Sequence, residues 1–158
     1  MTMRIGSGYD VHAFAPARAL VLGGVTIPYE LGLAGHSDAD AVIHAVVDAL
    51  LGAAALGDIG QHFPSSDERW KDRPSAVFLD YTLDLLCQHD WKISNIDATI
   101  VAERPKMLPH IPAMRAHLAE HLGLEIEQVS VKATTTDKLG FTGRREGIAC
   151  YAVALLEK

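Results

Sequence analysis

Apolar and polar residues alternate along the chain with two different periods, which predict strands and helices. Runs with strand-like spacing occupy residues 3–14, 20–22, 25–29, 93–102, 129–136 and 148–156. Helical spacing predicts helices over residues 40–56, 75–89 and 111–121. Gly23-Gly24 separates two of the strands and predicts a hairpin turn, whereas residues 31–40 are predicted to form a loop.

Local signals indicate where the helices begin and what they bury. Ser37 stands three residues before Asp40 and is the predicted N-cap of the first long helix. Pro74 marks the start of the second helix. The apolar stripe of that second helix is predicted to comprise Val77, Phe78, Tyr81 and Leu85.

The predicted order is three strands, two helices, one strand, one helix and two strands. Strands and helices mix without strict alternation, which favours an α+β fold. We therefore expect residues 1–158 to form a single catalytic domain with one mixed β-sheet and helices packed on one face.

Composition and charge narrow the class of protein. The 158 residues are 49% hydrophobic and 22% charged, which is enough for a well-packed core. A formal net charge of −6 argues against nucleic-acid binding, and an anionic substrate would need local help from metal ions or helix N-termini. Without a bilayer-length apolar run or targeting segment, we expect a cytoplasmic protein with no membrane contact. Cys87 and Cys150 are expected to be buried thiols.

Three residues suggest a metal site. Asp10 and His12 are two apart in a predicted strand, so their side chains share one face, and His44 lies in the first predicted helix. Two histidines and a carboxylate can hold a tetrahedral Zn²⁺ with one position open, as in catalytic sites. Asp48, one turn after His44, is predicted to accept a hydrogen bond from its free ring nitrogen. The alternative is chance, because the chain has eight histidines.

Other segments suit phosphates and sugars, each with a purely structural alternative. His36 stands at a predicted helix start, where an anion site and a simple capping loop are equally expected. Asp58 lies in a glycine-bounded turn and suits a sugar hydroxyl or only the turn itself. Thr134, Thr135 and Thr136 suit phosphate oxygens or merely a strand, and Asp137 suits Mg²⁺ or Mn²⁺. The loop with Phe141 and Arg144 offers a cation to an anion.

A set of short motifs occurs in a characteristic order over nearly the whole chain. It comprises Gly8-Tyr9-Asp10-Val11-His12, Gly35-His36-Ser37-Asp38, Ala55-Leu56-Gly57-Asp58-Ile59-Gly60, Phe63-Pro64, Pro105-Lys106-Met107, Lys132 to Thr136, Lys138 to Arg144, and Glu146-Gly147-Ile148. Each motif is modest, but together they are specific. The sequence closely resembles the 2-C-methyl-D-erythritol 2,4-cyclodiphosphate synthase family.

The resemblance implies an enzyme of the non-mevalonate isoprenoid pathway. It would cyclise 4-diphosphocytidyl-2-C-methyl-D-erythritol 2-phosphate to 2-C-methyl-D-erythritol 2,4-cyclodiphosphate and release CMP. The resemblance also implies Zn²⁺ on Asp10, His12 and His44, and Mg²⁺ or Mn²⁺ bridging the diphosphate with Asp137 as ligand. It further implies a homotrimer with active sites between neighbouring subunits.

Residue roles follow from the same resemblance. His36 and Thr135 match groups that stabilise the transition state, Asp58 and Gly60 match ribose contacts, and residues 102–108 with 133–135 match a cytosine pocket. The residues implied to contact substrate are Ser37, Asp58, Ile59, Gly60, Phe63, Ser65, Asp67, Ala102, Pro105, Lys106, Met107, Leu108, Ala133, Thr134, Thr136, Phe141 and Arg144.

Two positions depart from the family pattern. Asp137 replaces the usual Glu, which shortens the side chain by one methylene, so that it is expected to reach a second metal only with adjustment or through a water. Ser65 replaces the usual acid after Phe63-Pro64, although Asp67 lies close enough in sequence to retain that role.

Two other functions remain open. A non-haem iron oxygenase also uses two histidines and a carboxylate, although its usual His-x-Asp order is the reverse of Asp10 and His12. A trimeric protein that binds a phosphate or an isoprenoid without turnover is the non-enzymatic alternative.

Overall fold

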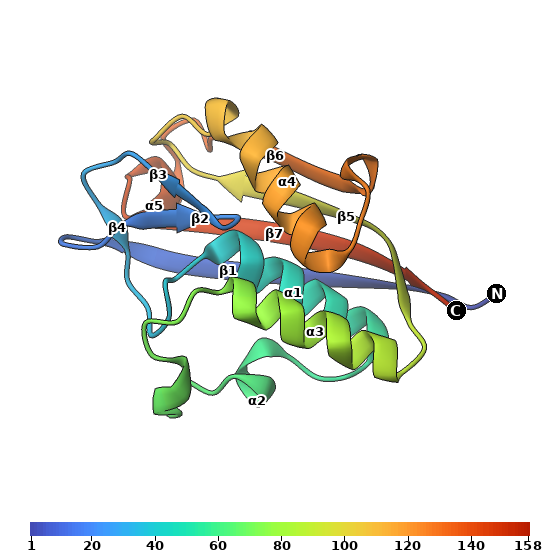
Figure 1. The fold of residues 1–158 in the computed structure, drawn as a ribbon. Helices are drawn as coiled ribbons and strands as arrows, with labels where there is room; N and C mark the ends of the chain where they lie inside the picture. The colour runs from blue at the N-terminus through green and yellow to red at the C-terminus, as the bar shows by residue number, and fades with distance from the viewer.

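A five-stranded sheet lies at the centre of the fold. The structure is a computed structural model that describes all residues from 1 to 158 (Figure 1). The strands run in the order β4-β1-β7-β5-β6, and only β5 and β6 are parallel. Their bounds are β4 Gly32–Leu33, β1 Met3–Ala15, β7 Gly147–Glu157, β5 Lys92–Val101 and β6 Val129–Thr134. The expected mixed sheet and α+β class are therefore confirmed.

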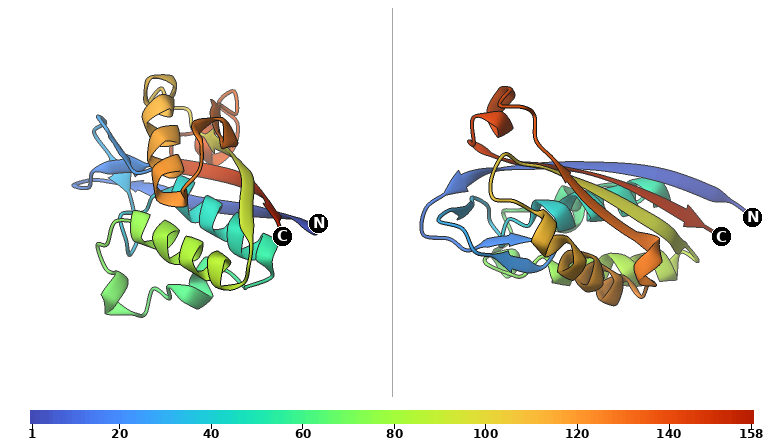
Figure 2. Two further views of the ribbon diagram at one scale, coloured as in Figure 1. Left: turned by 45° about the vertical axis from the view of Figure 1, so that its right-hand side comes forward. Right: turned by 90° about the horizontal axis from the view of Figure 1, so that it is seen from above.

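The three long helices lie on one face of this sheet, as predicted (Figures 1 and 2). They are α1 Ala41–Ala54, α3 Ala76–Gln88 and α4 Ile111–Leu122. Helix α1 packs directly on β1 and β7, α4 packs on β6, and α3 covers α1 from outside. Short helices occupy the connections: α2 Ile59–His62, α5 Gly140–Gly143 and 3₁₀ turns at Glu68–Trp70, Leu108–His110 and Ile126–Gln128.

Helix α1 lies unusually close to strand β1 because two glycines of β1 face it. A Cβ atom on Gly8 would lie 1.9 Å from the carbonyl oxygen of Ala45, and one on Gly6 would lie 2.1 Å from that of Ala49. Such distances are impossible for real atoms, so only glycine permits this approach. The helix faces the sheet with alanines and is buried on nearly every side. This contact sets the distance between residues on the two elements.

The start of α1 is anchored by Asp40. This residue, and not Ser37 as predicted, is the N-cap, and its side chain accepts hydrogen bonds from the N–H groups of Val42 and Ile43. The same carboxyl accepts from the N–H groups of Gly23 and Gly24. Complete burial raises the pKa of Asp40 to about 6. The hairpin is thereby tied to the helix start.

Several details of the secondary structure differ from the prediction. The hairpin β2 Leu20–Leu22 and β3 Val25–Ile27 forms a separate two-stranded sheet, and its second strand is two residues shorter than expected. Strand β4 lies inside the predicted loop 31–40, since its pairing with β1 is a tertiary contact without local signature.

The buried stripe of α3 is also shifted from the predicted one. Val77 and Tyr81 are exposed, and the side chains facing the core are Phe78, Leu79, Thr82 and Leu86. Cys150 is buried as expected, but Cys87 is exposed because it lies on the outer side of α3, which covers α1 and has no layer over it.

The face of the sheet opposite the helices is apolar and uncovered. Alternation along β1 and β7 places Ile5, Tyr9, Val11, Tyr151 and Val153 there, with exposed fractions between 38% and 73%. The rings of Tyr9 and Tyr151 pair across the strands at 4.7 Å between centroids. Patches of this kind mark interaction surfaces more often than free surface.

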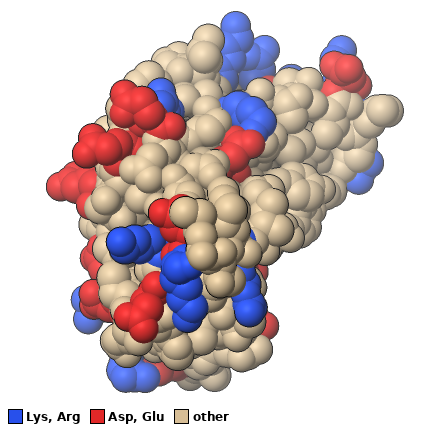
Figure 3. All heavy atoms as spheres, turned by 90° about the vertical axis from the view of Figure 1, so that its right-hand side faces the viewer, with Lys and Arg blue, Asp and Glu red and all other residues tan.

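The charged side chains on the surface do not form a patch of one sign on the face shown in Figure 3. Acidic and basic side chains lie interspersed over the face shown in Figure 3. None of the helices has the length and apolar character needed to span a membrane.

The glycine contact can be tested with Gly8→Ala. The added methyl group has to displace the backbone of α1 at Ala45, so we expect a loss of several kcal/mol of stability, as for other overpacked sites. Chemical unfolding measures the loss. Gly52→Ala is the control, because a Cβ there meets only the Ser7 carbonyl oxygen at 3.9 Å. Equal stability of the Gly8→Ala variant and the wild type would contradict the proposed role of this glycine.

Candidate functional site

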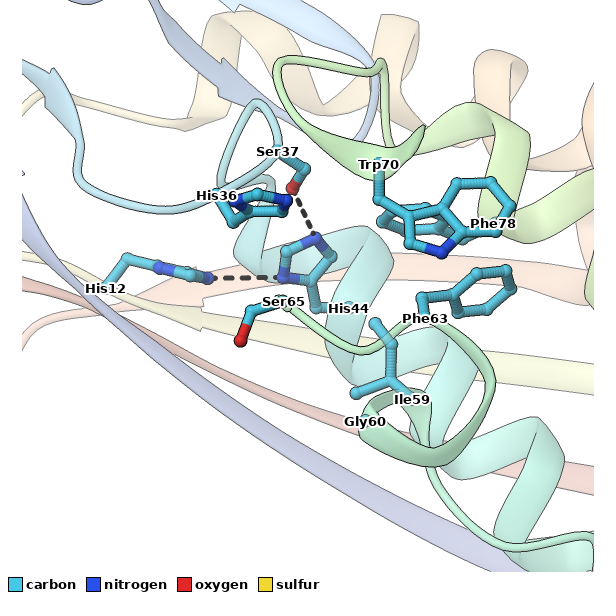
Figure 4. Close-up of a pocket in the computed structure, with 10 residues that line it drawn as sticks. All are labelled: His12, His36, Ser37, His44, Ile59, Gly60, Phe63, Ser65, Trp70 and Phe78. Atoms are coloured by element: carbon cyan, nitrogen blue, oxygen red, sulfur yellow. Dashed lines mark hydrogen bonds between the residues drawn. The ribbon is translucent and has the colours of Figure 1, made fainter. Parts of the chain in front are cut away.

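Asp10, His12 and His44 meet where β1 passes the first turn of α1. On β1, the residues that face the helix are Gly6, Gly8, Asp10 and His12, because side chains alternate along a strand. The glycines bring the helix close, and the next two positions carry the ligands. His44 follows the Asp40 cap by one helical turn and points back toward β1 (Figure 4).

The three side chains are spaced for one metal ion. His12 Nε2 lies 2.8 Å from Asp10 Oδ2, and His44 Nδ1 lies 3.2 Å from both Asp10 Oδ2 and His12 Nε2. Tetrahedral ligands at normal zinc distances are separated by about 3.3 Å. This is the one group of three or more potential ligands with such spacing in the chain. The donor set, one carboxylate and two imidazoles, fits Zn²⁺ and leaves a fourth position for substrate.

The charges of the group favour a bound cation. Burial opposes ionisation of Asp10, but the adjacent His12 and His44 rings outweigh it and lower the pKa of this carboxyl to about 2. Burial also opposes protonation of His12, and the hydrogen bond to Asp10 outweighs it, so the pKa of His12 is raised. Both shifts reflect attraction between the Asp10 carboxylate and positive charge beside it. A divalent cation can supply that positive charge.

Both imidazoles are oriented by hydrogen bonds on their far sides. His12 Nδ1 donates to the carbonyl oxygen of Ala34 at 2.7 Å, which leaves its Nε2 free for a metal. His44 Nε2 lies 2.9 Å from Ser75 Oγ and 3.2 Å from Ser37 Oγ. Sequence reasoning missed Ser75, which carries only the signal of a helix N-cap after Pro74.

The predicted partner of His44 is wrong. The Asp48 carboxylate accepts a hydrogen bond from the Ile59 N–H group at 2.8 Å and makes no hydrogen bond to the His44 ring, whose partners include Asp10 and Ser75. Its position one turn along α1 places it beside α2 and away from the nitrogen of His44 that needs an acceptor. Asp48 therefore ties α1 to α2. Burial raises the pKa of its carboxyl.

A cavity of about 220 Å³ opens beside His12 and His44 (Figure 4). The structure brings to it most of the nearby residues predicted from the sequence. Its lining comprises His12, His36, Ser37, His44, Ile59, Gly60, Phe63, Ser65, Trp70 and Phe78. Phe78 was missed as a site residue because an aromatic residue in a helical stripe predicts core packing equally well. Trp70 lies outside every predicted helix and strand and carried no signal.

Apolar rings form one side of this cavity. Phe63 stacks on Phe78 with ring centroids 4.3 Å apart, and Trp70 meets both rings edge-on. On the other side are the polar groups of His36, Ser37 and Ser65 (Figure 4). The cavity thus suits a ligand with a phosphate at the metal end and a carbon skeleton at the aromatic end.

Two acidic residues predicted to contact substrate lie at the margin. Asp58 is the N-cap of α2, and its carboxylate accepts a hydrogen bond from the Gln61 N–H group at 2.9 Å. The turn that follows α1 therefore also begins α2. Asp67 pairs with Arg69 at 2.6 Å, and this hydrogen bond lowers the pKa of Asp67. The Asp67 carbonyl oxygen lies 3.2 Å from His36 Nε2.

A second cavity, of about 300 Å³, lies at the ends of β5 and β6. It gathers every residue of the predicted cytosine pocket except Arg104. Its lining comprises Ala102, Glu103, Pro105, Lys106, Met107, Leu108, Ala133, Thr134 and Thr135. The two cavities share no residue. On the sheet, strands β7 and β5 lie between Asp10 and Ala133, and the intervening residues Cys150 and Ile100 are both fully buried.

The remaining predicted residues lie in the connection between β6 and β7. Asp137 is outside the Asp10 group, and its Oδ1 lies 3.5 Å from Thr135 Oγ1. Arg144 pairs with Glu146 at 2.9 Å. Thr136 donates to the Leu139 carbonyl oxygen at 2.6 Å, which braces the loop.

Comparison with known proteins places this architecture in a family. The model of the YgbB family matches residues 3–157, nearly the entire chain. The chain belongs to the YgbB family.

Curated relatives of this YgbB-family chain carry one name, 2-C-methyl-D-erythritol 2,4-cyclodiphosphate synthase. The protein of Azotobacter vinelandii is 60% identical over 98% of both chains. That of Clostridium perfringens is 57% identical over 99% of this chain and 100% of the relative. The relatives are thus named as enzymes, and the Asp10, His12 and His44 group is consistent with a metal-dependent one.

Solved structures share the fold. The bifunctional IspDF from Campylobacter jejuni has a TM-score of 0.95 and 41% identity, and the match covers 98% of this chain and 42% of that one. A Plasmodium falciparum IspF in complex with CDP has a TM-score of 0.86 and 35% identity, over 98% of this chain and 95% of that one.

The metal group can be tested with His44→Ala. Only Asp10 and His12 remain as protein ligands in this variant, so we expect the affinity for zinc to fall by more than about 100-fold while the fold is retained. Zinc content after dialysis and far-UV circular dichroism measure these two outcomes. His89→Ala is the control, since His89 lies at the C-terminus of α3. Stoichiometric zinc in the His44→Ala variant would refute the assignment.

Proposed function

We propose that this enzyme cyclises 4-diphosphocytidyl-2-C-methyl-D-erythritol 2-phosphate to 2-C-methyl-D-erythritol 2,4-cyclodiphosphate and releases CMP. The observation that carries the proposal is the group of Asp10, His12 and His44, with a fourth ligand position facing a cavity that is polar at one end and aromatic at the other. The names of its relatives agree with this reaction. Residues 1–158 act together as one catalytic domain.

The reaction needs positioning more than acid–base chemistry. An oxygen of the 2-phosphate attacks the β-phosphorus and forms the new P–O bond. The bond from the β-phosphorus to the oxygen bridging the α-phosphorus breaks, and that oxygen leaves with its electron pair as part of CMP. The nucleophile is tethered and already anionic at neutral pH. The protein must therefore fold the substrate back on itself and stabilise negative charge.

Asp10, His12 and His44 would hold Zn²⁺ in this site. A bound divalent ion there supplies Lewis-acid stabilisation of phosphate charge. Asp137 would hold a second ion, Mg²⁺ or Mn²⁺, near the diphosphate, directly or through water. These carboxylates serve as ligands and not as general bases.

Further hydrogen-bond donors complete the phosphate site. His36 and Ser37 line the cavity beside His44 and donate hydrogen bonds to phosphate oxygens, while Thr135 does the same from the end of β6. Phe63 and Ile59 enclose the methylerythritol carbons, with Trp70 and Phe78 behind them. Asp58 and Gly60 hold the ribose, and Ser65 or Asp67 contacts a hydroxyl group.

The cytosine base occupies the second cavity. Residues 102, 103, 105–108 and 133–135 form its walls, and small side chains such as Ala102 and Ala133 leave room for a flat ring. Lys106, Met107 and Leu108 line the same cavity, with Pro105 at its turn. A Plasmodium falciparum IspF has been solved with CDP, which supports a nucleotide of this class.

The active enzyme is a homotrimer whose sites lie between subunits. The uncovered apolar face of β1 and β7 supports assembly, because a monomer would expose it to water. The division of the site into two cavities that share no residue supports a shared site, in which the metal side of one subunit meets the cytosine side of its neighbour. Phe141 and Arg144 then lie at the junction. Unpaired Cys87 and Cys150 are in keeping with a cytoplasmic enzyme.

The alternative functions are not favoured. The relatives carry the name of a synthase and not of an oxygenase. A pure binding protein for phosphates or isoprenoids has no need of a metal with a vacant position.

Phosphorus NMR tests the reaction directly. The candidate substrate incubated with enzyme and zinc should lose its diphosphate and phosphomonoester resonances and gain those of a cyclic diphosphate and CMP. A chelator should stop the conversion, and excess zinc should restore it. Persistence of the substrate signals with zinc-loaded, folded enzyme would refute the proposed function.

Shared sites can be tested by mixing two inactive variants. His44→Ala removes the metal side, and Ala133→Leu fills the cytosine cavity, so neither variant alone should turn over substrate. Co-refolded trimers contain sites with an intact half from each neighbour, which should restore about a quarter of wild-type turnover by random assembly. Each variant refolded alone, which gives trimers of a single variant, is the control. No recovery, with trimers confirmed by sedimentation, would contradict shared sites.

A further inference from the structure

A buried hydrogen-bond chain holds the His44 ring on the side away from Asp10 and His12. Ser75 at the start of α3 is fully buried, and its Oγ lies 2.9 Å from His44 Nε2. Behind it, the Asp38 carboxylate accepts hydrogen bonds from the Ser75 hydroxyl and from the Ser75 N–H group, the latter at 2.9 Å. The chain links α1, α3 and the loop before α1.

The chemistry of these groups fixes the direction of each hydrogen bond. A carboxylate only accepts, so the Ser75 hydroxyl gives its one proton to Asp38. The Ser75 oxygen can then only accept, and His44 Nε2 must be the donor. A neutral imidazole protonated at Nε2 has its lone pair on Nδ1. In His44 this is the atom that lies 3.2 Å from Asp10 Oδ2.

Ser75 has no other evident use for its hydroxyl. It occupies the N-cap position of α3, yet its side chain makes no capping hydrogen bond. Neither Ser75 nor Asp38 lines the cavity beside His44, so neither is placed to contact substrate there. Ser37 differs, because its Oγ accepts from the Ala39 N–H group and the residue lines the cavity.

We propose that Asp38 and Ser75 are positioning residues that hold His44 in the tautomer and ring orientation required for metal binding. The carboxylate polarises the serine hydroxyl, which in turn makes the His44 ring a better ligand. The inference rests on the proposed metal site, and Asp38 and Ser75 lie outside that site. Loss of the chain should weaken the metal more than it weakens the fold.

The test compares Ser75→Ala with Thr82→Val. Thr82 is also fully buried on α3, but its hydroxyl donates to the Phe78 carbonyl oxygen within the helix and is remote from His44. Both variants are prepared metal-free, and zinc affinity is measured by competition with a chromophoric chelator. We expect Ser75→Ala to bind zinc about 10- to 100-fold more weakly and Thr82→Val to match the wild type. Equal affinity in all three proteins overturns the proposal.

A double-variant cycle tests whether the two residues act as one chain. Asp38→Asn should weaken zinc binding in the wild-type background and have little further effect in the Ser75→Ala background. Fully additive losses would mean that Asp38 acts independently of Ser75, which contradicts the proposal.

A spectroscopic measurement covers the case in which Ser75→Ala fails to fold. Nitrogen-15 NMR of the His44 ring in metal-free wild-type enzyme should show protonation at Nε2, and protonation at Nδ1 alone would overturn the proposal. Absence of zinc binding by the wild type itself would refute the metal site and the proposed function with it. Normal zinc binding by Ser75→Ala would refute only the positioning role.

Discussion

The close contact between the backbone of α1 and strand β1 is the constraint on which the site depends. Gly6 and Gly8 remove the side chains that would separate a helix from a sheet at ordinary distance. Because the helix lies so near, His44 comes within 3.2 Å of groups on the adjacent strand. A normal helix-to-sheet spacing would leave the three ligands too far apart for one ion. The packing of small residues therefore determines the chemistry.

The chain resolves the conflict between an acidic protein and an anionic substrate locally. Its net charge of −6 would repel a diphosphate, but the groups nearest the cavity are imidazoles and hydroxyls. Asp10, the carboxylate of the metal group, is paired with two histidines and has a pKa of about 2. It would remain an anionic ligand over the whole physiological range. Preorganised ligands of this kind lose little free energy to reorganisation when metal and substrate bind.

The two faces of the sheet have separate tasks. The face covered by helices forms the core and carries Asp10 and His12, whereas the uncovered face carries exposed apolar side chains. Within one chain, the fully buried Cys150 and Ile100 lie between Asp10 and Ala133 on the sheet. In the proposed trimer, assembly would both complete the site and bury this apolar surface.

The sequence alone determined the elements and the metal group. Period-two and helical spacing predicted the long strands and helices correctly, because these patterns record which side of an element is buried. Alternation in β1 placed Asp10 and His12 on one face, and the motif order indicated the family. These inferences depend on local spacing, which the sequence displays directly.

Only the tertiary structure decided which distant groups touch. Asp48 shares a helix face with His44, yet its carboxylate accepts a hydrogen bond from the Ile59 N–H group. The partner of the His44 ring, predicted to be Asp48, is instead Ser75 from another helix. The N-cap of α1 is Asp40 and not Ser37, and the N–H groups of the hairpin residues Gly23 and Gly24 also donate hydrogen bonds to the Asp40 carboxyl. Such partners depend on how α1, α3 and the hairpin pack together in space. Spacing along a single element does not contain that information.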